Sequence, residues 1–171
     1  MFRELSMTSA QRARLRNAPK YALRPVPLWV YNPVFQAMIR QIGRRQPQLF
    51  RRLGEHCQKN FLIEPQNLPF VLLLQPDPAR LSLRAYRSRN GLNYQVRISG
   101  SFLQLLRLLD SRLDSDAAFF SRDIVIEGDT EAVVCLRNAL DDVEGSIASD
   151  VAGMFGIVGR RSLQFLRKIE A

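Results

Sequence analysis

Four short β-prone runs between residues 60 and 99 constrain the fold of this chain more than any other feature. The runs are Phe61 to Glu64, Phe70 to Gln75, Leu81 to Tyr86 and Asn93 to Ser99. Turn-forming segments separate them, and the last of these, Arg89-Asn90-Gly91, is a typical hairpin signal. The spacing therefore predicts an antiparallel meander.

Alternation of apolar and polar residues indicates which face of this sheet is covered. In the third run the apolar residues lie at odd positions, and in the fourth run they lie at even positions. A period of two is typical of strands with one face against a core and the other face in water. The run Phe70 to Gln75 is apolar on both sides, so the sequence leaves its inward face open.

Helical patterns flank the strands. Asn32 followed by Pro33 predicts a helix start, because asparagine caps helices and the proline ring is fixed at a helical φ. Apolar residues then recur at helical spacing as far as Leu53. After the fourth strand, Ser101 is expected to start a helix that continues to Asp110 and is more apolar than a one-sided surface helix requires.

The last predicted elements of the folded part follow residue 120. Ile124 to Glu127 reads as a fifth strand that ends at Gly128, and Asp129 or Thr130 is expected to cap the next helix. Together the elements predict an α+β fold, a five-stranded and mainly antiparallel sheet with helices on one face. An apolar tunnel is expected rather than a fully filled core.

Three regions are expected along the chain. Residues 1–31 form a basic N-terminal arm with a short helix and a Pro-rich linker, residues 32–145 form the folded domain, and residues 146–171 form a C-terminal amphipathic helical segment.

The positive charge is concentrated in the first third of the chain. The formal net charge is +9, and residues 1–60 contain twelve Lys or Arg against two Glu. The remaining residues contain thirteen basic and fourteen acidic side chains. Such a field attracts anionic phospholipid headgroups, nucleic acid or an acidic partner. The alternative is that the arginines form only solvated helix faces.

Several classes of protein are disfavoured. The longest apolar run, Phe70 to Leu74, is far shorter than the roughly 20 residues that cross a bilayer, and no secretory signal is expected at the N-terminus. A reducing, cytoplasmic location is therefore expected. Cys57 and Cys135 lack metal-ligand spacing and are expected to be ordinary buried or half-buried thiols.

The residues that commonly carry catalysis are scarce. His56 is the only histidine, and on a helix its neighbour Cys57 would point about 100° away from it. Ser99-Gly100-Ser101 lacks the nucleophile elbow of hydrolases. The acidic residues Asp110, Asp114 and Asp116 lack the glycine and closing glutamate of an ion-binding loop. We therefore expect no enzyme activity, no metal and no cofactor.

Two segments, Arg97 to Asp110 and Arg122 to Arg137, resemble the second half of the sterol-carrier-protein domain. In that family a strand leads into a helix that lines the pocket, and a strand that ends in Gly-Asp leads into the next helix. More narrowly, Ser121 to Ala132, together with the Asn32-Pro33 helix start, resembles the UbiT family of accessory lipid-binding factors in oxygen-independent ubiquinone biosynthesis.

This resemblance implies a non-catalytic protein that binds an isoprenoid quinone intermediate or a phospholipid and acts at the inner membrane surface from the cytoplasm. It also points to iron–sulfur hydroxylase-like subunits of the ubiquinone pathway as partners. With the alternation pattern, it gives the residues expected to line the lipid: Leu72, Leu74, Leu81, Leu83, Tyr94, Val96, Ile98, Phe102, Leu105, Leu106, Leu109 and, as part of a lid, Phe155.

Membrane contact is expected from the basic arm and from the aromatic patch that follows it. The residues are Arg12, Arg14, Arg16, Lys20, Trp29 and Tyr31. Arginines neutralise phosphate in lipid headgroups, and indole and phenol rings suit the headgroup interface. The arm also fits RNA or another nucleic acid, which is the alternative function, although the strands offer no paired exposed aromatics for base stacking. For Trp29 and Tyr31, simple packing on the domain is the other interpretation.

Overall fold

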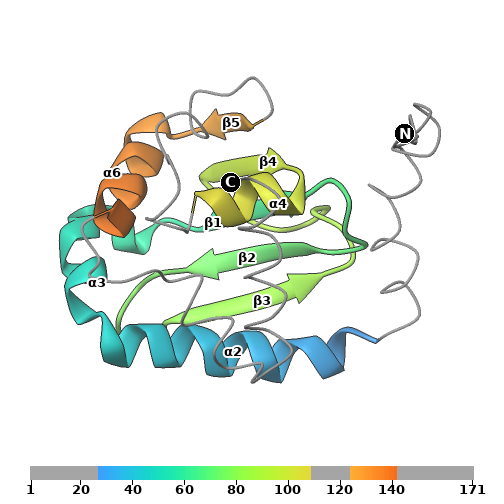
Figure 1. Ribbon diagram of the computed structural model, residues 1–171, viewed down its shortest axis with the longest axis horizontal. Coiled ribbons are helices and arrows are strands. Elements are labelled where there is room, and N and C mark those ends of the chain that lie inside the picture. Colours follow the sequence, from blue (N-terminus) through green and yellow to red (C-terminus); the bar gives the residue numbers. More distant parts are fainter. Residues whose placement is uncertain (1–26, 109–123, 142–171) are drawn as a thin grey trace, which may run out of the picture.

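A five-stranded sheet with helices on one side forms the part of the chain that the computed structural model describes, residues 27–108 and 124–141 (Figure 1). The strands are β1 (Phe61–Pro65), β2 (Val71–Gln75), β3 (Ser82–Tyr86), β4 (Val96–Gly100) and β5 (Val125–Gly128). The helices are α2 (Leu28–Arg45), α3 (Pro47–Leu53), the 3₁₀ turn η1 (Gly54–Gln58), α4 (Phe102–Arg107) and α6 (Thr130–Asp141). The predicted α+β class and strand number are confirmed.

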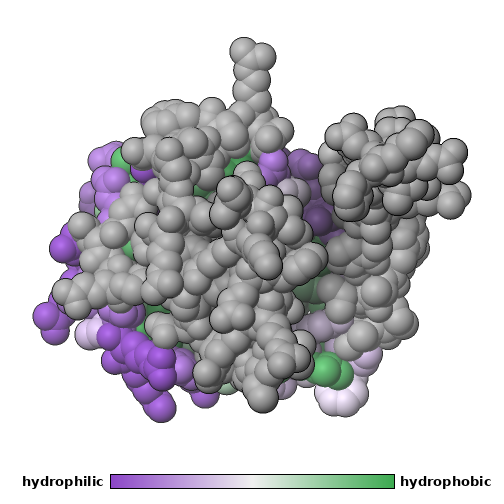
Figure 2. All heavy atoms as spheres, in the orientation of Figure 1, coloured by the Kyte–Doolittle hydropathy of each residue, from purple (hydrophilic) through white to green (hydrophobic). Residues whose placement is uncertain are grey.

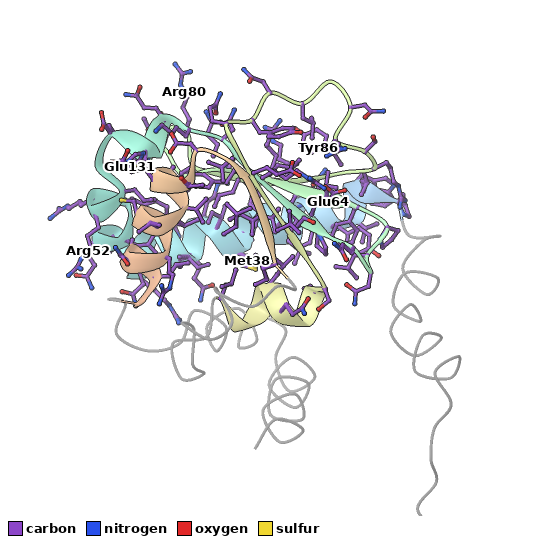
Figure 3. All side chains as sticks on the ribbon, turned by 90° about the horizontal axis from the view of Figure 1, so that it is seen from above. Met38, Arg52, Glu64, Arg80, Tyr86 and Glu131 are labelled. Carbon is purple, nitrogen blue, oxygen red and sulfur yellow. The ribbon has the colours of Figure 1, made fainter. Side chains whose placement is uncertain are left out.

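The order of the strands corrects the predicted meander. The sheet runs β3-β2-β1-β4-β5, so β4 lies beside β1 and is parallel to it, while the other three pairs are antiparallel. Asn90-Gly91 makes a turn, with Gly91 at φ 78°, but that turn belongs to a longer connection, residues 87–95, and not to a hairpin. In the view from above, this connection and α4 lie on opposite sides of the sheet (Figure 3).

The free edge of β3 is covered by side chains from α2, which is why no strand pairs there. Asn32 Oδ1 accepts a hydrogen bond from the Ala85 N–H (2.7 Å). Gln36 accepts from the Leu83 N–H (3.4 Å) and donates to the Leu81 carbonyl (2.9 Å). Amide side chains on a helix thus satisfy the edge groups that would otherwise invite another strand.

The role of Asn32 differs from the expected one. Helix α2 begins at Leu28 after Pro27, so Asn32 lies inside the helix and caps nothing, and Pro33 is an internal proline. Tertiary contacts outweigh the local signal here, because the rings of Tyr31 and Phe70 lie 5.4 Å apart between centroids. Residues 28–31 of the predicted arm therefore form the first turn of α2.

Replacing Asn32 with alanine should destabilise the protein. The change leaves the N–H of the buried Ala85 without its partner, and a buried unsatisfied donor costs about 1 to 3 kcal/mol. Urea unfolding followed by circular dichroism measures the loss. Gln41→Ala, on the same helix, is the matched control and should cost less than about 0.5 kcal/mol. Equal losses for the two variants would contradict this role for Asn32.

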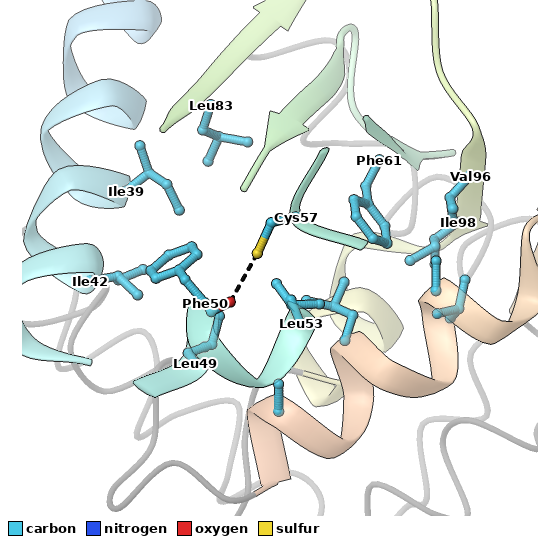
Figure 4. Close-up of a cluster of buried hydrophobic side chains, with 14 of the residues drawn as sticks. Ile39, Ile42, Leu49, Phe50, Leu53, Cys57, Phe61, Leu83, Val96 and Ile98 are labelled. Carbon is cyan, nitrogen blue, oxygen red and sulfur yellow. Dashed lines mark hydrogen bonds between the residues drawn. The ribbon is translucent and has the colours of Figure 1, made fainter. Parts of the chain in front are cut away.

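The core lies between the helices and the inner face of the sheet (Figure 4). It combines buried residues of every described layer: Ile39, Ile42, Leu49, Phe50, Leu53, Cys57, Phe61, Leu83, Val96, Ile98, Leu105, Ile124, Ala132, Val133, Leu136 and Ala139. Cys57 donates its S–H to the Phe50 carbonyl (2.9 Å), and burial is the main cause that raises the pKa of this thiol. Cys57 is thus the buried thiol that the sequence predicted, and Cys135 is half-buried.

Both helices that follow strands β4 and β5 are capped by side chains. Ser101 Oγ accepts from the Gln104 N–H (3.3 Å) and Gln104 Oε1 accepts from the Ser101 N–H (2.8 Å), which is a reciprocal capping box. At α6, Asp129 Oδ1 accepts from the Ala132 N–H (2.9 Å), so Asp129 is the cap residue. The predicted starts of these two helices are therefore confirmed.

Candidate functional site

The inner face of the sheet presents two parallel rows of apolar residues, which the strand register aligns. The first row, from β3 to β4, is Leu83, Leu74, Phe61 and Val96, and the second row, from β3 to β5, is Ala85, Leu72, Ile63, Ile98 and Ile126. Every member is apolar. The register also settles the inward face of β2, because Leu72 and Leu74 lie beside inward residues of β1 and β3.

The centre of the second row is less covered than its neighbours. Ala85 on the edge strand β3 and Ile98 on β4 are buried, whereas Leu72 and Ile63 on the two strands between them are half-buried. In a fully packed core the middle strands are the most deeply buried part of a sheet. The inner face therefore keeps accessible apolar surface at its middle.

Two helices flank this accessible surface. Phe35 and Met38 of α2 are half-buried and pack against the core cluster, and the labelled Met38 lies on the α4 side of the sheet in Figure 3. On α4, Leu105 is buried while Phe102 is 41% exposed. The Phe102 N–H donates to Asn67 Oδ1 (2.8 Å), which ties the first turn of α4 to the β1–β2 turn.

The residues expected to line a lipid fall into three groups. Leu72, Leu74, Leu81, Leu83, Val96, Ile98 and Leu105 belong to the core cluster or pack against it. Tyr94 is half-buried in the connection before β4, and Phe102 is exposed. Leu109 and Phe155 lie outside the described residues, and so does the side chain of Leu106.

Ile63, Phe35 and Met38 were not among the expected lining residues. Ile63 lies in a β-prone run, and Phe35 and Met38 lie at helical spacing, so each segment carried a local signal. Only the pairing of Ile63 with Leu72 shows that these two residues share a face of the sheet.

The structure describes two of the expected membrane-contact residues, Trp29 and Tyr31, and their surroundings differ. Trp29 is 75% exposed at the start of α2, whereas the Tyr31 ring packs against Phe35 and Phe70. The Tyr31 side chain is half-buried in this packing, and its contact with a membrane stays a prediction. Arg12, Arg14, Arg16 and Lys20 lie outside the described residues.

The outer face of the sheet is mixed, because apolar residues such as Leu62 and Leu73 share it with a charged cluster around Arg97. Arg97 donates to Glu64 through Nε (2.6 Å) and forms an ion pair with Glu127 through Nη1 (2.7 Å). The hydrogen bond to Glu127 is the largest cause that raises the pKa of Arg97.

Two surface pockets lined by described residues lie away from the apolar rows. One, of about 570 Å³, follows α2 around Arg40, Gln41 and Arg44. The other, of about 860 Å³, lies between the β1–β2 turn and residues 87–90. Among the described residues expected to line a lipid, none contributes to either pocket.

His56 and Cys57 do not form a catalytic pair. Lys59 Nζ donates to His56 Nδ1 (2.8 Å) and to Asp129 (2.5 Å), and the Cys57 thiol points to a carbonyl of α3. Within residues 27–108 and 124–141, no three His, Cys, Asp or Glu side chains gather as a metal site would require. In the same ranges no helix has the length and apolarity needed to cross a bilayer.

The Lys59–Asp129 pair predicts an acid-sensitive contribution to stability. The hydrogen bond from Lys59, followed by that from the Ala132 N–H, lowers the pKa of Asp129 in the folded chain. A lowered folded pKa adds stability above the unfolded pKa of about 4, and this stability is lost as the pH falls through the folded pKa. Asp129→Asn should therefore be less stable than the parent at pH 7, and the difference should shrink below pH 4.

Urea unfolding of the parent and Asp129→Asn at pH 7 and pH 3 tests this dependence. Glu131→Gln, which removes a carboxylate from the same turn of α6, is the control and should show no such pH-dependent difference. A constant difference between parent and Asp129→Asn at both pH values would contradict the prediction.

Comparison with known proteins agrees with this architecture. The model of the SCP-2 sterol transfer family matches residues 36–141. A solved structure described as a UbiJ-SCP2 ubiquinone synthesis protein superposes with a TM-score of 0.52 at 14% identity, over 68% of this chain and 93% of that chain. A search of curated protein sequences finds no match.

Two further solved structures are more distant. Apo sterol carrier protein 2 from Yarrowia lipolytica has a TM-score of 0.44 at 8% identity, over 63% of this chain and 84% of that chain. The sterol carrier protein domain 2 of Helicoverpa armigera has a TM-score of 0.43 at 14% identity, over 64% and 87%. With more than half of its length matched by the family model, the chain belongs to the SCP-2 sterol transfer family.

Proposed function

We propose that this protein is a non-catalytic accessory factor that binds the apolar tail of an isoprenoid quinone intermediate or of a phospholipid. The observation that carries the proposal is the accessible apolar surface at Ile63 and Leu72, in the middle of a sheet that helices cover. Exposed apolar area of this kind gains roughly 25 cal/mol for each Å² that a ligand buries. An apolar site with polar surroundings is what a lipid tail requires.

The tail would lie against the second row of the inner face. Leu72 and Ile63 of that row would contact it directly, Leu74 of the first row would contact it beside them, and Phe102 would cover it from α4. The more deeply buried residues of the expected lining, Leu83, Val96, Ile98 and Leu105, would form the floor beneath it, and the half-buried Leu81 would lie at its edge. Tyr94, Leu106 and Leu109 would also line the lipid tail, and Phe155 would belong to a lid over it.

Family membership and the narrower sequence resemblance support a place in the oxygen-independent ubiquinone pathway. The neighbour described as a ubiquinone synthesis protein shares the fold, and the segment Ser121 to Ala132 resembles accessory factors of the oxygen-independent route. The protein would hold or present the isoprenoid tail while other proteins, such as iron–sulfur hydroxylase-like subunits, carry out the chemistry.

Deleting the gene and measuring ubiquinone during anoxic and oxic growth tests the pathway. We expect ubiquinone to fall under anoxic growth and to stay unchanged under oxic growth, with recovery when the gene is restored. Unchanged anoxic ubiquinone would contradict the assignment.

We propose that the basic arm holds the protein at an anionic leaflet, from the cytoplasmic side. Each Lys or Arg near such a surface contributes about 1 kcal/mol, so Arg12, Arg14, Arg16 and Lys20 would give weak, reversible binding that salt loosens. Replacing these four with Gln should weaken co-sedimentation with anionic vesicles and leave that with neutral vesicles unchanged. Equal binding to anionic vesicles by the parent and by this variant would mean that the arm serves another partner. RNA that co-purifies with the protein would favour nucleic-acid binding.

A further inference from the structure

The pocket between the β1–β2 turn and residues 87–90 combines two kinds of lining. Its cationic and polar side is made by Arg87, Ser88 and Arg89, and its apolar side by Leu68 and Pro69 of the turn. With a volume of about 860 Å³, it is large enough for a phospholipid headgroup and its glycerol.

The described residues of this lining carry a net positive charge. Glu64 is the acidic residue among them, and that carboxylate already accepts a hydrogen bond from Arg97 at 2.6 Å. Arg89 Nη1 lies 4.0 Å from the same carboxylate and remains exposed, as does Arg87. Guanidinium groups bind phosphate oxygens in a planar, bidentate geometry, so a phosphate is the ligand that such a lining favours.

An exposed aromatic residue lies at the same end of the molecule. Phe70 lines the pocket, and its ring contacts that of Tyr31 in the first turns of α2. Trp29 and Val30 in that turn are 75% and 41% exposed. Figure 2 shows hydrophobic and nearly neutral atoms over the start of α2, at the lower right, and strongly hydrophilic atoms at the lower left. Tryptophan beside cationic groups is typical of a membrane interface.

The exposed Phe102 of α4, which would cover the lipid tail, is tied to this end as well. Asn67 in the β1–β2 turn accepts the Phe102 N–H, so the exposed Phe102 and the pocket share that turn. In Figure 1 the start of α2, the start of β2 and the end of β3 lie together at the right. A bilayer against this end would therefore meet both the cationic pocket and the first turn of α4.

We propose that this end docks on an anionic phospholipid bilayer, with a headgroup phosphate between Arg87 and Arg89 and with Trp29 among the headgroups. The proposal rests on the proposed function, because it names the surface from which the lipid tail would be taken. It differs in its residues, since it names Arg87 and Arg89 and not the arginines of the basic arm. Docking in this orientation spares the tail a passage through water.

Vesicle co-sedimentation of the full chain tests the pocket. The parent and Arg87→Gln/Arg89→Gln are compared on phosphatidylcholine vesicles with and without about one third phosphatidylglycerol. Removing two arginines from the docking surface should lower the affinity for the anionic vesicles about tenfold or more and leave the affinity for neutral vesicles unchanged. The matched control Arg51→Gln/Arg80→Gln removes the same charge from α3 and the β2–β3 turn and should lose less than twofold.

A second variant guards against a folding defect. Ser88→Asp puts a negative charge into the pocket, keeps an acceptor for the Asn90 N–H and leaves both arginines in place. It should weaken binding to anionic vesicles by about half the free energy lost in the double variant, with an unchanged urea midpoint. Equal binding by the Arg87/Arg89 variant and the parent, or an equal loss in the control pair, would overturn the proposal.

Trp29 gives an independent measurement because it is the only tryptophan. Its fluorescence should shift to the blue on anionic vesicles and be quenched by brominated phospholipid, and an unchanged spectrum for bound protein would contradict the orientation. Lipid extraction separates this proposal from the proposed function. Arg87→Gln/Arg89→Gln should still retain its lipid, whereas a parent that binds vesicles through the pocket but carries no lipid would contradict only the proposed function.

Discussion

Replacing Gly128 with alanine should destabilise the protein by roughly 3 to 5 kcal/mol, the largest loss that we expect from a single methyl group. Gly128 ends β5 at φ 89°, where a side chain is strained. A Cβ there would also lie far inside van der Waals distance of the Gln95 carbonyl oxygen. That oxygen accepts the Asp129 N–H (3.1 Å), so moving it would disturb the start of α6 too.

Gly91→Ala is the matched control for this prediction. Gly91 has a similar φ of 78°, but a Cβ there would meet nothing within 4 Å. The control should therefore cost only the backbone strain, about 1 to 2 kcal/mol. Urea unfolding of both variants measures the difference. Equal losses in the free energy of unfolding would mean that the close approach of a Cβ to Gln95 adds no destabilisation.

Replacing Leu72 with tryptophan should weaken lipid binding at least tenfold, with little loss in the free energy of unfolding. Leu72 is half-buried at the centre of the second row, so the added ring can occupy the surface that a lipid tail would cover. Where a core is already full, the same enlargement costs about 1 to 3 kcal/mol. Binding of a fluorescent fatty acid and the urea midpoint, measured on the same preparation, distinguish the two cases.

Leu73→Trp is the control, because Leu73 is the next residue of β2, is also half-buried and faces the outer side of the sheet. Lipid binding should be unchanged in this variant. A loss of lipid binding in both variants, or in neither, would contradict the placement of the site on the inner face.

The strands could be located from the sequence because alternation and turn residues are local signals. The partner of β4 could not be predicted in the same way. Asn90-Gly91 forms the turn that the sequence indicated, but whether a turn closes a hairpin depends on the space beside β3. That space is taken by Asn32 and Gln36 of α2, residues that lie about fifty positions earlier in the chain.

The candidate site was predictable in part for the same reason. Val96 and Ile98 alternate with polar neighbours, so their inward face was readable. Leu72 lies in a run that is apolar on both sides, and only its register with Ile63 fixes its direction. Asn32 carried a strong local capping signal, yet tertiary packing of Tyr31 on Phe70 extends the helix by more than a turn.

Extraction of the purified protein with organic solvent, followed by mass spectrometry of the extract, tests the central claim most directly. We expect an isoprenoid quinone intermediate or a phospholipid to elute in a defined ratio from the parent and from Leu73→Trp, and we expect Leu72→Trp to lose it. An extract with only detergent or nothing, from a parent protein that also fails to bind added isoprenoid or phospholipid, would contradict it.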